Sequence, residues 1–124
     1  MPILITNIKN ALLKDALMKT QPKKVVFIHE DMITEDQFKS LVSDLNFQIE
    51  YLHVPLDDLK TASFKLNEIL SNSFKESSDV YFALEPDAMG LQILEAAKEF
   101  NIKKFYMVQA GKLNEFKACF IKGF

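Results

Sequence analysis

Five short apolar segments alternate with amphipathic stretches along this chain. The apolar segments lie at residues 2–6, 24–29, 49–54, 80–84 and 104–109, and they are rich in branched and aromatic side chains. Because successive positions within them are mostly apolar, each segment is typical of a strand covered on both faces, as in a parallel sheet. The regular alternation argues against an all-helical bundle and against a β-sandwich.

Between these segments, apolar residues recur at intervals of three and four, which is the period of an amphipathic helix. The positions that define the four predicted helices are Leu12, Leu13, Ala16 and Leu17, then Phe38, Leu41, Val42 and Leu45, then Ala62, Leu66, Ile69 and Leu70, and finally Met89, Ile93, Ala96 and Ala97. Residues 34–37 form a capping box that predicts the start of the second helix. The third helix is expected to end in the polar stretch 71–78, and the fourth to run from about Pro86 to Phe100.

A turn signal at residues 110–112 predicts a closing hairpin, with a sixth, antiparallel strand at residues 116–121. Right-handed crossovers place the first strand in the centre, the second and third on one side, and the fourth and fifth on the other. The fold class predicted is therefore α/β: a Rossmann-like three-layer domain with a mainly parallel sheet of about six strands. At 124 residues, the chain is expected to form a single domain over residues 1–124.

Charge and glycine content narrow the possible ligands. The net charge is −2, so no broad cationic field favours long nucleic acid as a partner. All 15 basic residues are lysine, so a phosphate would be held by lysine ammonium groups or backbone N–H groups rather than by a guanidinium fork. With only three glycines and no G-x-G-x-x-G or Walker A sequence, the chain is not expected to use a nucleotide cofactor of those classes, and we predict no cofactor.

The cellular setting is predicted from cysteine usage and from the N-terminus. Cys119 is the only cysteine, which excludes a disulfide within the chain and favours a reducing, cytoplasmic location. Its apolar neighbours predict a small buried side chain rather than a nucleophile. The N-terminus lacks the features of a signal peptide, and no apolar run reaches membrane-spanning length, so we expect a soluble protein without a membrane partner.

Ligands of open α/β sheets bind beyond the carboxyl ends of the strands, close to helix N-termini. After the first strand, residues 6–10 offer hydroxyl, amide and ammonium groups that suit a phosphate or a ribose, although a capped helix with a solvated lysine is the commoner explanation of such a segment. His29 and His53 end neighbouring strands and could face the same crevice, or they could be satisfied within the fold. Their spacing does not match a metal signature, and we predict no metal site.

Residues 85–93, following the fourth strand, resemble a degenerate copy of the D-x-D-x-x-G turn of Toprim nucleases, whose paired acids hold magnesium. Glu85 and Asp87 would be the acids, since hard cations take oxygen ligands. In this chain Glu85 replaces the first aspartate, and Met89 and Leu91 stand where the family usually has charged residues. The alternative is structural, with Glu85 or Asp87 capping the following helix. A third hypothesis is a non-catalytic module whose acidic turn and aromatic hairpin dock another protein.

Over nearly its full length, the chain is similar to the CRISPR-associated Rossmann-fold (CARF) sensor domains, in particular those of nucleases that carry a restriction-like effector domain. The order of elements carries this resemblance more than any motif. The matching segments are residues 21–30, followed by Thr34 and an amphipathic helix, then residues 49–55, residues 79–84, and the hairpin from residues 105–109 to residues 119–121.

The resemblance implies a two-fold homodimer that binds cyclic oligoadenylate across its axis, through the loops after strands one and four. By position, the ligand-binding residues are Thr6, Asn7, Lys9 and Asn10 in the first loop and Glu85, Pro86, Asp87, Ala88 and Met89 in the second, with His29 added from its place at the crevice. No effector domain follows the sixth strand, so the chain is expected to be a ring nuclease, a regulatory subunit or an excised fragment. In a ring nuclease, Lys9 and Asn10 would stabilise developing charge. Many relatives have a glycine- and threonine-rich turn with a lysine after strand four, where this chain has two acids and a proline.

Overall fold

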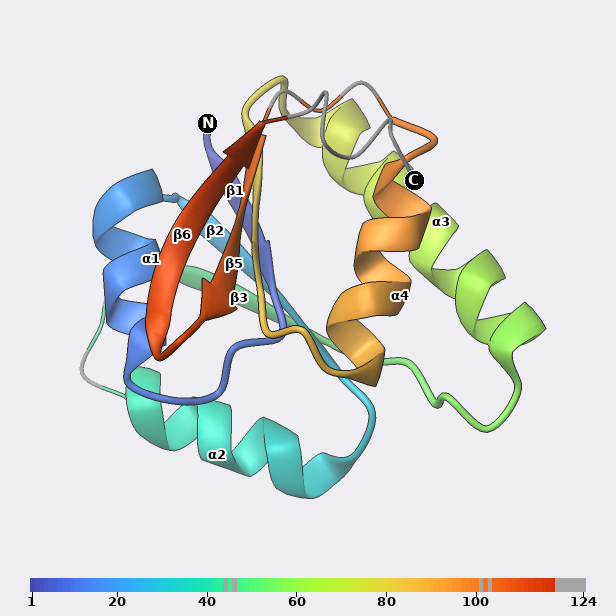
Figure 1. Cartoon of the computed structure of the whole chain (residues 1–124), viewed down its shortest axis with the longest axis horizontal. Coiled ribbons are helices and arrows are strands. Elements are labelled where there is room, and N and C mark those ends of the chain that lie inside the picture. The colour runs from blue at the N-terminus through green and yellow to red at the C-terminus, as the bar shows by residue number, and fades with distance from the viewer. Residues whose placement is uncertain (44, 46, 101, 103, 118–124) are drawn as a thin grey trace.

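The structure is a computed structural model of the chain, shown in Figure 1. It describes residues 1–43, 45, 47–100, 102 and 104–117, without the side chains of residues 32–34. The elements in chain order are β1 (Ile3–Thr6), α1 (Leu12–Thr20), β2 (Lys24–His29), α2 (Met32–Val42), β3 (Gln48–His53), α3 (Leu59–Glu76), β4 (Val80–Leu84), α4 (Ala88–Ala97), β5 (Lys104–Gln109) and β6 (Lys112–Lys117).

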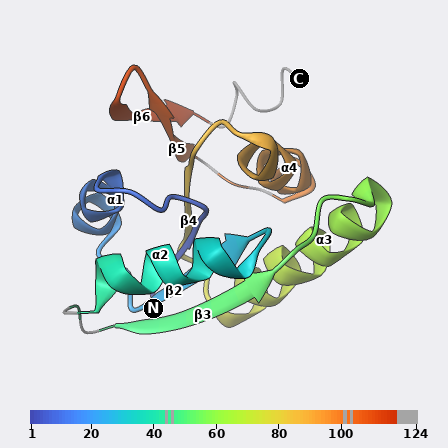
Figure 2. The ribbon, with the colours of Figure 1, turned by 90° about the horizontal axis from the view of Figure 1, so that it is seen from below.

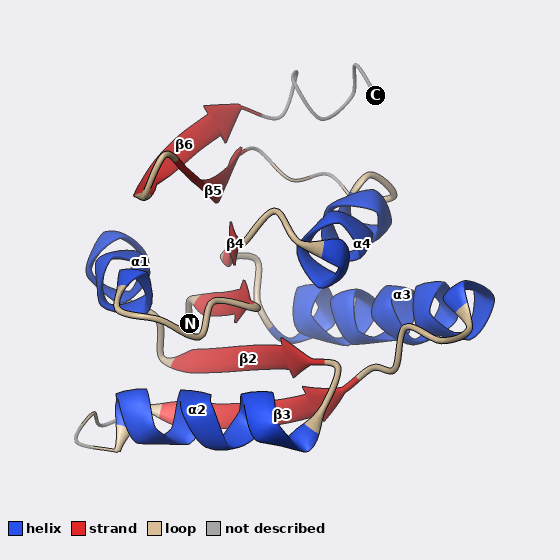
Figure 3. Cartoon of the chain, turned by 60° about the horizontal axis from the view of Figure 1, so that its bottom comes forward, coloured by secondary structure: helices blue, strands red, loops and turns tan. Residues whose placement is uncertain are grey.

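The described strands form one six-stranded sheet in the order β3-β2-β1-β4-β5-β6. All neighbouring pairs are parallel except β5 and β6, which form an antiparallel hairpin at one edge. This is the strand order predicted from the sequence, with β1 in the centre and the antiparallel strand outermost. The fold is therefore a Rossmann-like α/β domain, and Figure 3 shows its helices and strands with the bottom of the Figure 1 view turned forward.

Helices cover both faces of the sheet and give the domain its three layers, which can be followed in Figure 2. Along β1, Ile3 and Ile5 face α3 and α4, whereas Leu4 faces α1 and α2, because successive side chains of a strand point to opposite faces. All three are fully buried. The two resulting cores are built around Leu66, Leu70 and Ile93 on one side and around Leu13, Phe27 and Phe38 on the other.

One helix boundary differs from the prediction in the first half of the chain, and another agrees with it. Helix α2 begins at Met32, so Thr34 lies inside the first turn instead of capping it. Helix α3 ends at Glu76, within the polar stretch 71–78 where its end was predicted. The Phe74 ring stacks on Phe100 of the segment after α4, with 5.1 Å between ring centroids, and this packing outweighs the low helix preference of the serines around it.

The fourth helix is shorter than predicted at both ends, because it begins at Ala88 and ends at Ala97. Pro86 therefore precedes the helix, and Asp87 is its N-cap. The sixth strand begins at Lys112, earlier than the predicted residue 116, because Ala110 and Gly111 alone make the hairpin turn. Both have positive φ, 53° and 72°, which is the pattern of a two-residue type I′ turn.

The predicted strand residues 118–121, including Cys119, lie outside the described residues. Among the helices that the structure describes, none combines the length and the apolar character needed to cross a lipid bilayer.

Candidate functional site

The loops that follow β1 and β4 meet at the carboxyl edge of the sheet. The two strands are neighbours in register, with Thr6 opposite Ala83, although they are far apart in the sequence. The chain continues from β1 to β2 on one side of β1, while β4 lies on its other side, so this is the point where the strand order reverses. Such a switch point is where open α/β sheets hold their ligands. The predicted convergence of the two loops is therefore confirmed.

Asn7 joins the two loops through its side chain. Its amide nitrogen donates to the Asp87 Oδ1 at 2.8 Å and to the Glu85 carbonyl oxygen at 3.4 Å. Its amide oxygen accepts from the Glu85 backbone N–H at 2.8 Å. Because Asn7 is only 5% exposed, these bonds are shielded from competing water, and the side chain acts as a rigid bridge between the loops.

A second, more exposed contact lies at the outer side of the crevice. The Asn10 amide nitrogen donates to the Glu85 Oε1 at 2.7 Å, and the Asn10 Oδ1 accepts from the Leu12 N–H at 2.9 Å, in the first turn of α1. One asparagine thus accepts a bond from the first N–H of α1 and holds a carboxylate from the neighbouring loop. The N-cap of α1 is Ala11, and Asn10 precedes it.

The turn after β4 packs directly on the start of α4. The Asp87 Oδ1 accepts from the Gly90 N–H at 2.9 Å, so Asp87 caps the helix in addition to accepting from Asn7. A Cβ atom on Gly90 would lie 1.7 Å from the Glu85 carbonyl oxygen, and glycine avoids this clash because it has no Cβ. This role of Gly90 was not predicted from the sequence, where the rarity of glycine was the available signal.

The predicted site residues differ in how accessible they are. Thr6 is fully buried, its Oγ1 accepts from the Ile8 N–H at 3.0 Å, and Met89 is also buried. Lys9 is exposed, and it has no ion pair with any residue in the described part of the chain. Exposed residues of the second loop are Pro86, Asp87 and Ala88. Among the predicted site residues, Lys9 is therefore the exposed cation.

His29 is not brought together with the two loops. Its ring is buried at the end of β2, where it stacks on His53 with 5.5 Å between ring centroids. The His29 Nδ1 lies 2.9 Å from the Asp31 carbonyl oxygen, and the His53 Nε2 lies 2.8 Å from the Glu30 carbonyl oxygen. The two histidines are thus engaged by the connection between β2 and α2.

The acids of the second loop have protein partners. Oδ1 of Asp87 accepts from Asn7 and Gly90, and Oε1 of Glu85 accepts from Asn10. Within the residues that the structure describes, no group of three or more histidine, cysteine, aspartate or glutamate side chains could hold a metal ion. The arrangement observed is that of a capped helix with a cross-loop bridge.

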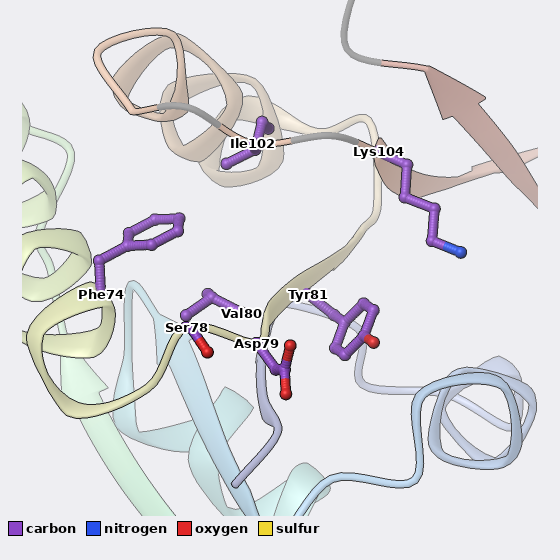
Figure 4. Close-up of a pocket in the computed structure, with 7 residues that line it drawn as sticks. All are labelled: Phe74, Ser78, Asp79, Val80, Tyr81, Ile102 and Lys104. Atoms are coloured by element: carbon purple, nitrogen blue, oxygen red, sulfur yellow. The ribbon is translucent and has the colours of Figure 1, made fainter.

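A cavity of about 280 Å³ lies at the opposite edge of the sheet, beside the amino ends of β4 and β5. Figure 4 shows Phe74 and Ile102 on one side of it and Lys104 on the other. The Lys104 ammonium group lies 3.6 Å from the Glu115 carboxylate, so its charge is largely balanced, whereas Asp79 adds a negative charge to the lining. This cavity is consequently less suited to an anion than the carboxyl edge with Lys9.

Comparison with known proteins gives no further guidance to the site. No family model matches the chain, and no curated protein matches it either.

Proposed function

We propose that the crevice between the β1 and β4 loops binds a cyclic oligoadenylate and that two copies of the chain enclose this ligand. The observation that carries the proposal is the convergence of the two loops at the switch point of the sheet, where Asn7 fixes them to each other. Loops that are already fixed to each other lose little conformational freedom on binding, which favours affinity. The nature of the ligand comes from the resemblance to CARF domains.

Lys9 is the residue proposed to attract the phosphates. Its exposed ammonium group has no ion pair in the described part of the chain, and a hydrogen bond from a cation to phosphate is about twice as strong as one between neutral groups. The negative charges of Glu85 and Asp87 oppose a polyanion. Their contacts with Asn10 and Asn7 direct one oxygen of each toward the protein, which reduces this opposition.

We propose a homodimer because residues of both loops are exposed. Lys9, Asn10, Pro86, Asp87 and Ala88 are all exposed, so a ring bound by one copy would keep one face in solvent. Closed two-fold dimers are the commonest assemblies of identical subunits, and a cyclic oligoadenylate with an even number of nucleotides matches their symmetry. We therefore propose that a second copy covers the outer face of the ligand.

Of the two roles implied by the resemblance, we propose the sensor rather than the ring nuclease. Cleavage requires groups free to stabilise charge that develops on the phosphate. The Asn10 amide nitrogen donates to Glu85 at 2.7 Å, and its oxygen accepts from the Leu12 N–H, so this residue already has partners in the absence of ligand. Lys9 alone would contribute to binding the phosphate.

Isothermal titration calorimetry with cyclic tri-, tetra- and hexa-adenylate tests the binding proposal. We expect heat with at least one ring, and at least about tenfold weaker binding by Lys9→Ala, because one charge-assisted hydrogen bond contributes about 1.5–3 kcal/mol. Lys14→Ala is the matched control, since Lys14 is also exposed and lies on α1 outside the crevice. Absence of heat with all three rings, or equal losses in both variants, would refute the proposal.

Chromatography of the recovered ligand distinguishes the sensor from the nuclease. After incubation without metal, a sensor returns the intact ring at every time point. A nuclease would instead accumulate a linear product with the wild type and none with the double variant Lys9→Ala/Lys14→Ala. That result would show that the sensor assignment is wrong, while leaving the binding site in place.

A further inference from the structure

The cavity at the amino edge of the sheet lies where β4 and β5 diverge. Strand β4 begins at Val80 and β5 at Lys104. Among the described residues, however, these two strands pair with each other only from Ala83, opposite Tyr106. The first residues of both strands therefore border an opening in the sheet, and the cavity of about 280 Å³ lies beside it. Backbone groups that lack a strand partner there have to bond water or a ligand.

The side chains that line this cavity come from both faces of the sheet. Phe74, Val80 and Ile102 belong to the core that α3 and α4 cover, whereas Tyr81 belongs to the core that α1 and α2 cover. Asp79 lies on the same side as Tyr81, because residues two apart in an extended segment share a face. The cavity is thus apolar toward α3 and α4 and polar toward the other face, as Figure 4 shows. A fitting ligand has one apolar end and one polar end.

The polar side of the cavity carries a carboxylate without a protein partner. The Asp79 N–H donates to the Ser77 Oγ at 3.0 Å, and the Asp79 carbonyl oxygen accepts from the Ile3 N–H at 2.8 Å. These bonds fix the backbone at the start of β4. Within the described part of the chain, no hydrogen bond or ion pair involves the Asp79 carboxylate itself, so it is available to a ligand.

The lysine that lines the cavity is already engaged. The Lys104 Nζ lies 3.6 Å from the Glu115 Oε1 and 5.9 Å from the centroid of the Tyr106 ring. Figure 4 shows its side chain extending away from Phe74. The charge left for a ligand is therefore the negative charge of Asp79, which favours a cation.

We propose that this cavity binds a small primary amine that carries an apolar group. The ammonium group pairs with the Asp79 carboxylate, and the Ser78 hydroxyl beside it is a further acceptor. The apolar group lies against Phe74, Val80 and Ile102. This ligand is opposite in charge to the one proposed for the crevice, and the two sites lie at opposite edges of the sheet, so neither proposal depends on the other.

The apolar wall supplies most of the affinity. Because Asp79 is exposed, its attraction to an ammonium group is weakened by water, as in other exposed ion pairs. Ile102 is buried, and the half-buried Phe74 ring is held by stacking on Phe100, with 5.1 Å between ring centroids. A wall that is ordered before binding loses little conformational freedom when the ligand arrives. Asp79 then selects among apolar ligands by the charge of their polar end.

Amide NMR of the 15N-labelled protein at pH 7.0 tests the ligand class with three probes that share a phenylethyl group: phenethylamine, 2-phenylethanol and 3-phenylpropionate. We expect phenethylamine to shift the amides of residues 79–82 and 104–106 saturably. Its dissociation constant should be about fivefold below that of the alcohol, which is the size of effect that an exposed ion pair produces. Equal affinities for the amine and the alcohol, tighter binding of the propionate, or no saturable shift with any probe would overturn the proposal.

Two variants test whether Asp79 makes the distinction. Asp79→Asn should bind phenethylamine no more tightly than 2-phenylethanol, and it should fold normally because the carboxylate makes no bond within the described part of the chain. Asp57→Asn is the matched control, since Asp57 is also exposed and lies between β3 and α3, outside the cavity. It should keep the preference for the amine. Loss of the preference in both variants, or in neither, would contradict the role of Asp79.

Nuclear Overhauser effects place the probe within the protein. The phenyl protons of bound phenethylamine should give effects to the methyl groups of Val80 and Ile102, which line the apolar side of the cavity. Effects confined to residues outside the cavity would show that the amine binds elsewhere and would overturn the assignment.

Discussion

Replacement of Asn7 by alanine should destabilise the protein far more than the loss of an ordinary loop side chain. It removes the two bonds donated to Asp87 and Glu85 and the one accepted from the Glu85 N–H. That N–H is then left without its partner in a part-buried position, and the Asp87 Oδ1 keeps only its bond from the Gly90 N–H. An unsatisfied buried polar group costs about 1–3 kcal/mol, so we expect the free energy of unfolding to fall by about 3 kcal/mol. For a domain of this size, the midpoint of thermal unfolding should drop by roughly 10 °C.

Urea unfolding followed by circular dichroism measures this loss, with an unchanged slope showing that both proteins unfold in one step. Asn10→Ala is the matched control, since its bonds to Glu85 and Leu12 are exposed, and we expect it to lose only about 1 kcal/mol. Asn7→Asp should be destabilised most above pH 5, where its carboxylate would face that of Asp87. The reasoning is refuted if Asn7→Ala is no less stable than Asn10→Ala.

Two further predictions concern stability. In urea unfolding, Gly90→Ala should lower the free energy of unfolding by about 3 kcal/mol or more, because the new Cβ would lie 1.7 Å from the Glu85 carbonyl oxygen. The control Gly111→Ala places its Cβ near no other atom but has φ 72°, so it should lose about 1 kcal/mol. Equal losses would contradict the close-approach argument. Burial lowers the pKa of Lys24, but the hydrogen bond to Glu76 and the nearby carboxylates raise it overall. The stabilising effect of this charge is therefore present below about pH 10.4 and is lost as the pH rises through the raised pKa of Lys24. Glu76→Gln should reduce this alkaline loss of stability in thermal melts. Identical melting curves of the two proteins would refute the role of the Lys24–Glu76 pair.

The topology could be predicted from the sequence because it depends on features that repeat along the chain. Each strand carries its own apolar run, and the handedness of crossovers then leaves few possible orders of strands. Element ends depend on the conformation of single residues. Ala110 adopts a positive φ, so β6 begins at Lys112 instead of residue 116, and this conformation is not visible in the local pattern.

The place of the crevice was also predictable, because the carboxyl ends of β1 and β4 must meet once the strand order is known. The partners within it were not. Asn7 and Asp87 are 80 positions apart, and whether an amide reaches a carboxylate at 2.8 Å depends on the register of two strands and on the shape of two loops. His29 was placed in the crevice because it ends a strand, but its ring turns toward α2 and β3.

Amide NMR of the 15N-labelled protein, titrated with cyclic tetra-adenylate, tests most directly whether the two loops form one ligand site. The account predicts that the largest shifts fall on residues 7–11 and 85–90 together and that they are absent in Lys9→Ala at the same ligand concentration. Shifts confined to one loop, shifts confined to residues 78–81 and 104 at the opposite edge, or an unchanged spectrum with the tri-, tetra- and hexa-adenylate rings would contradict it.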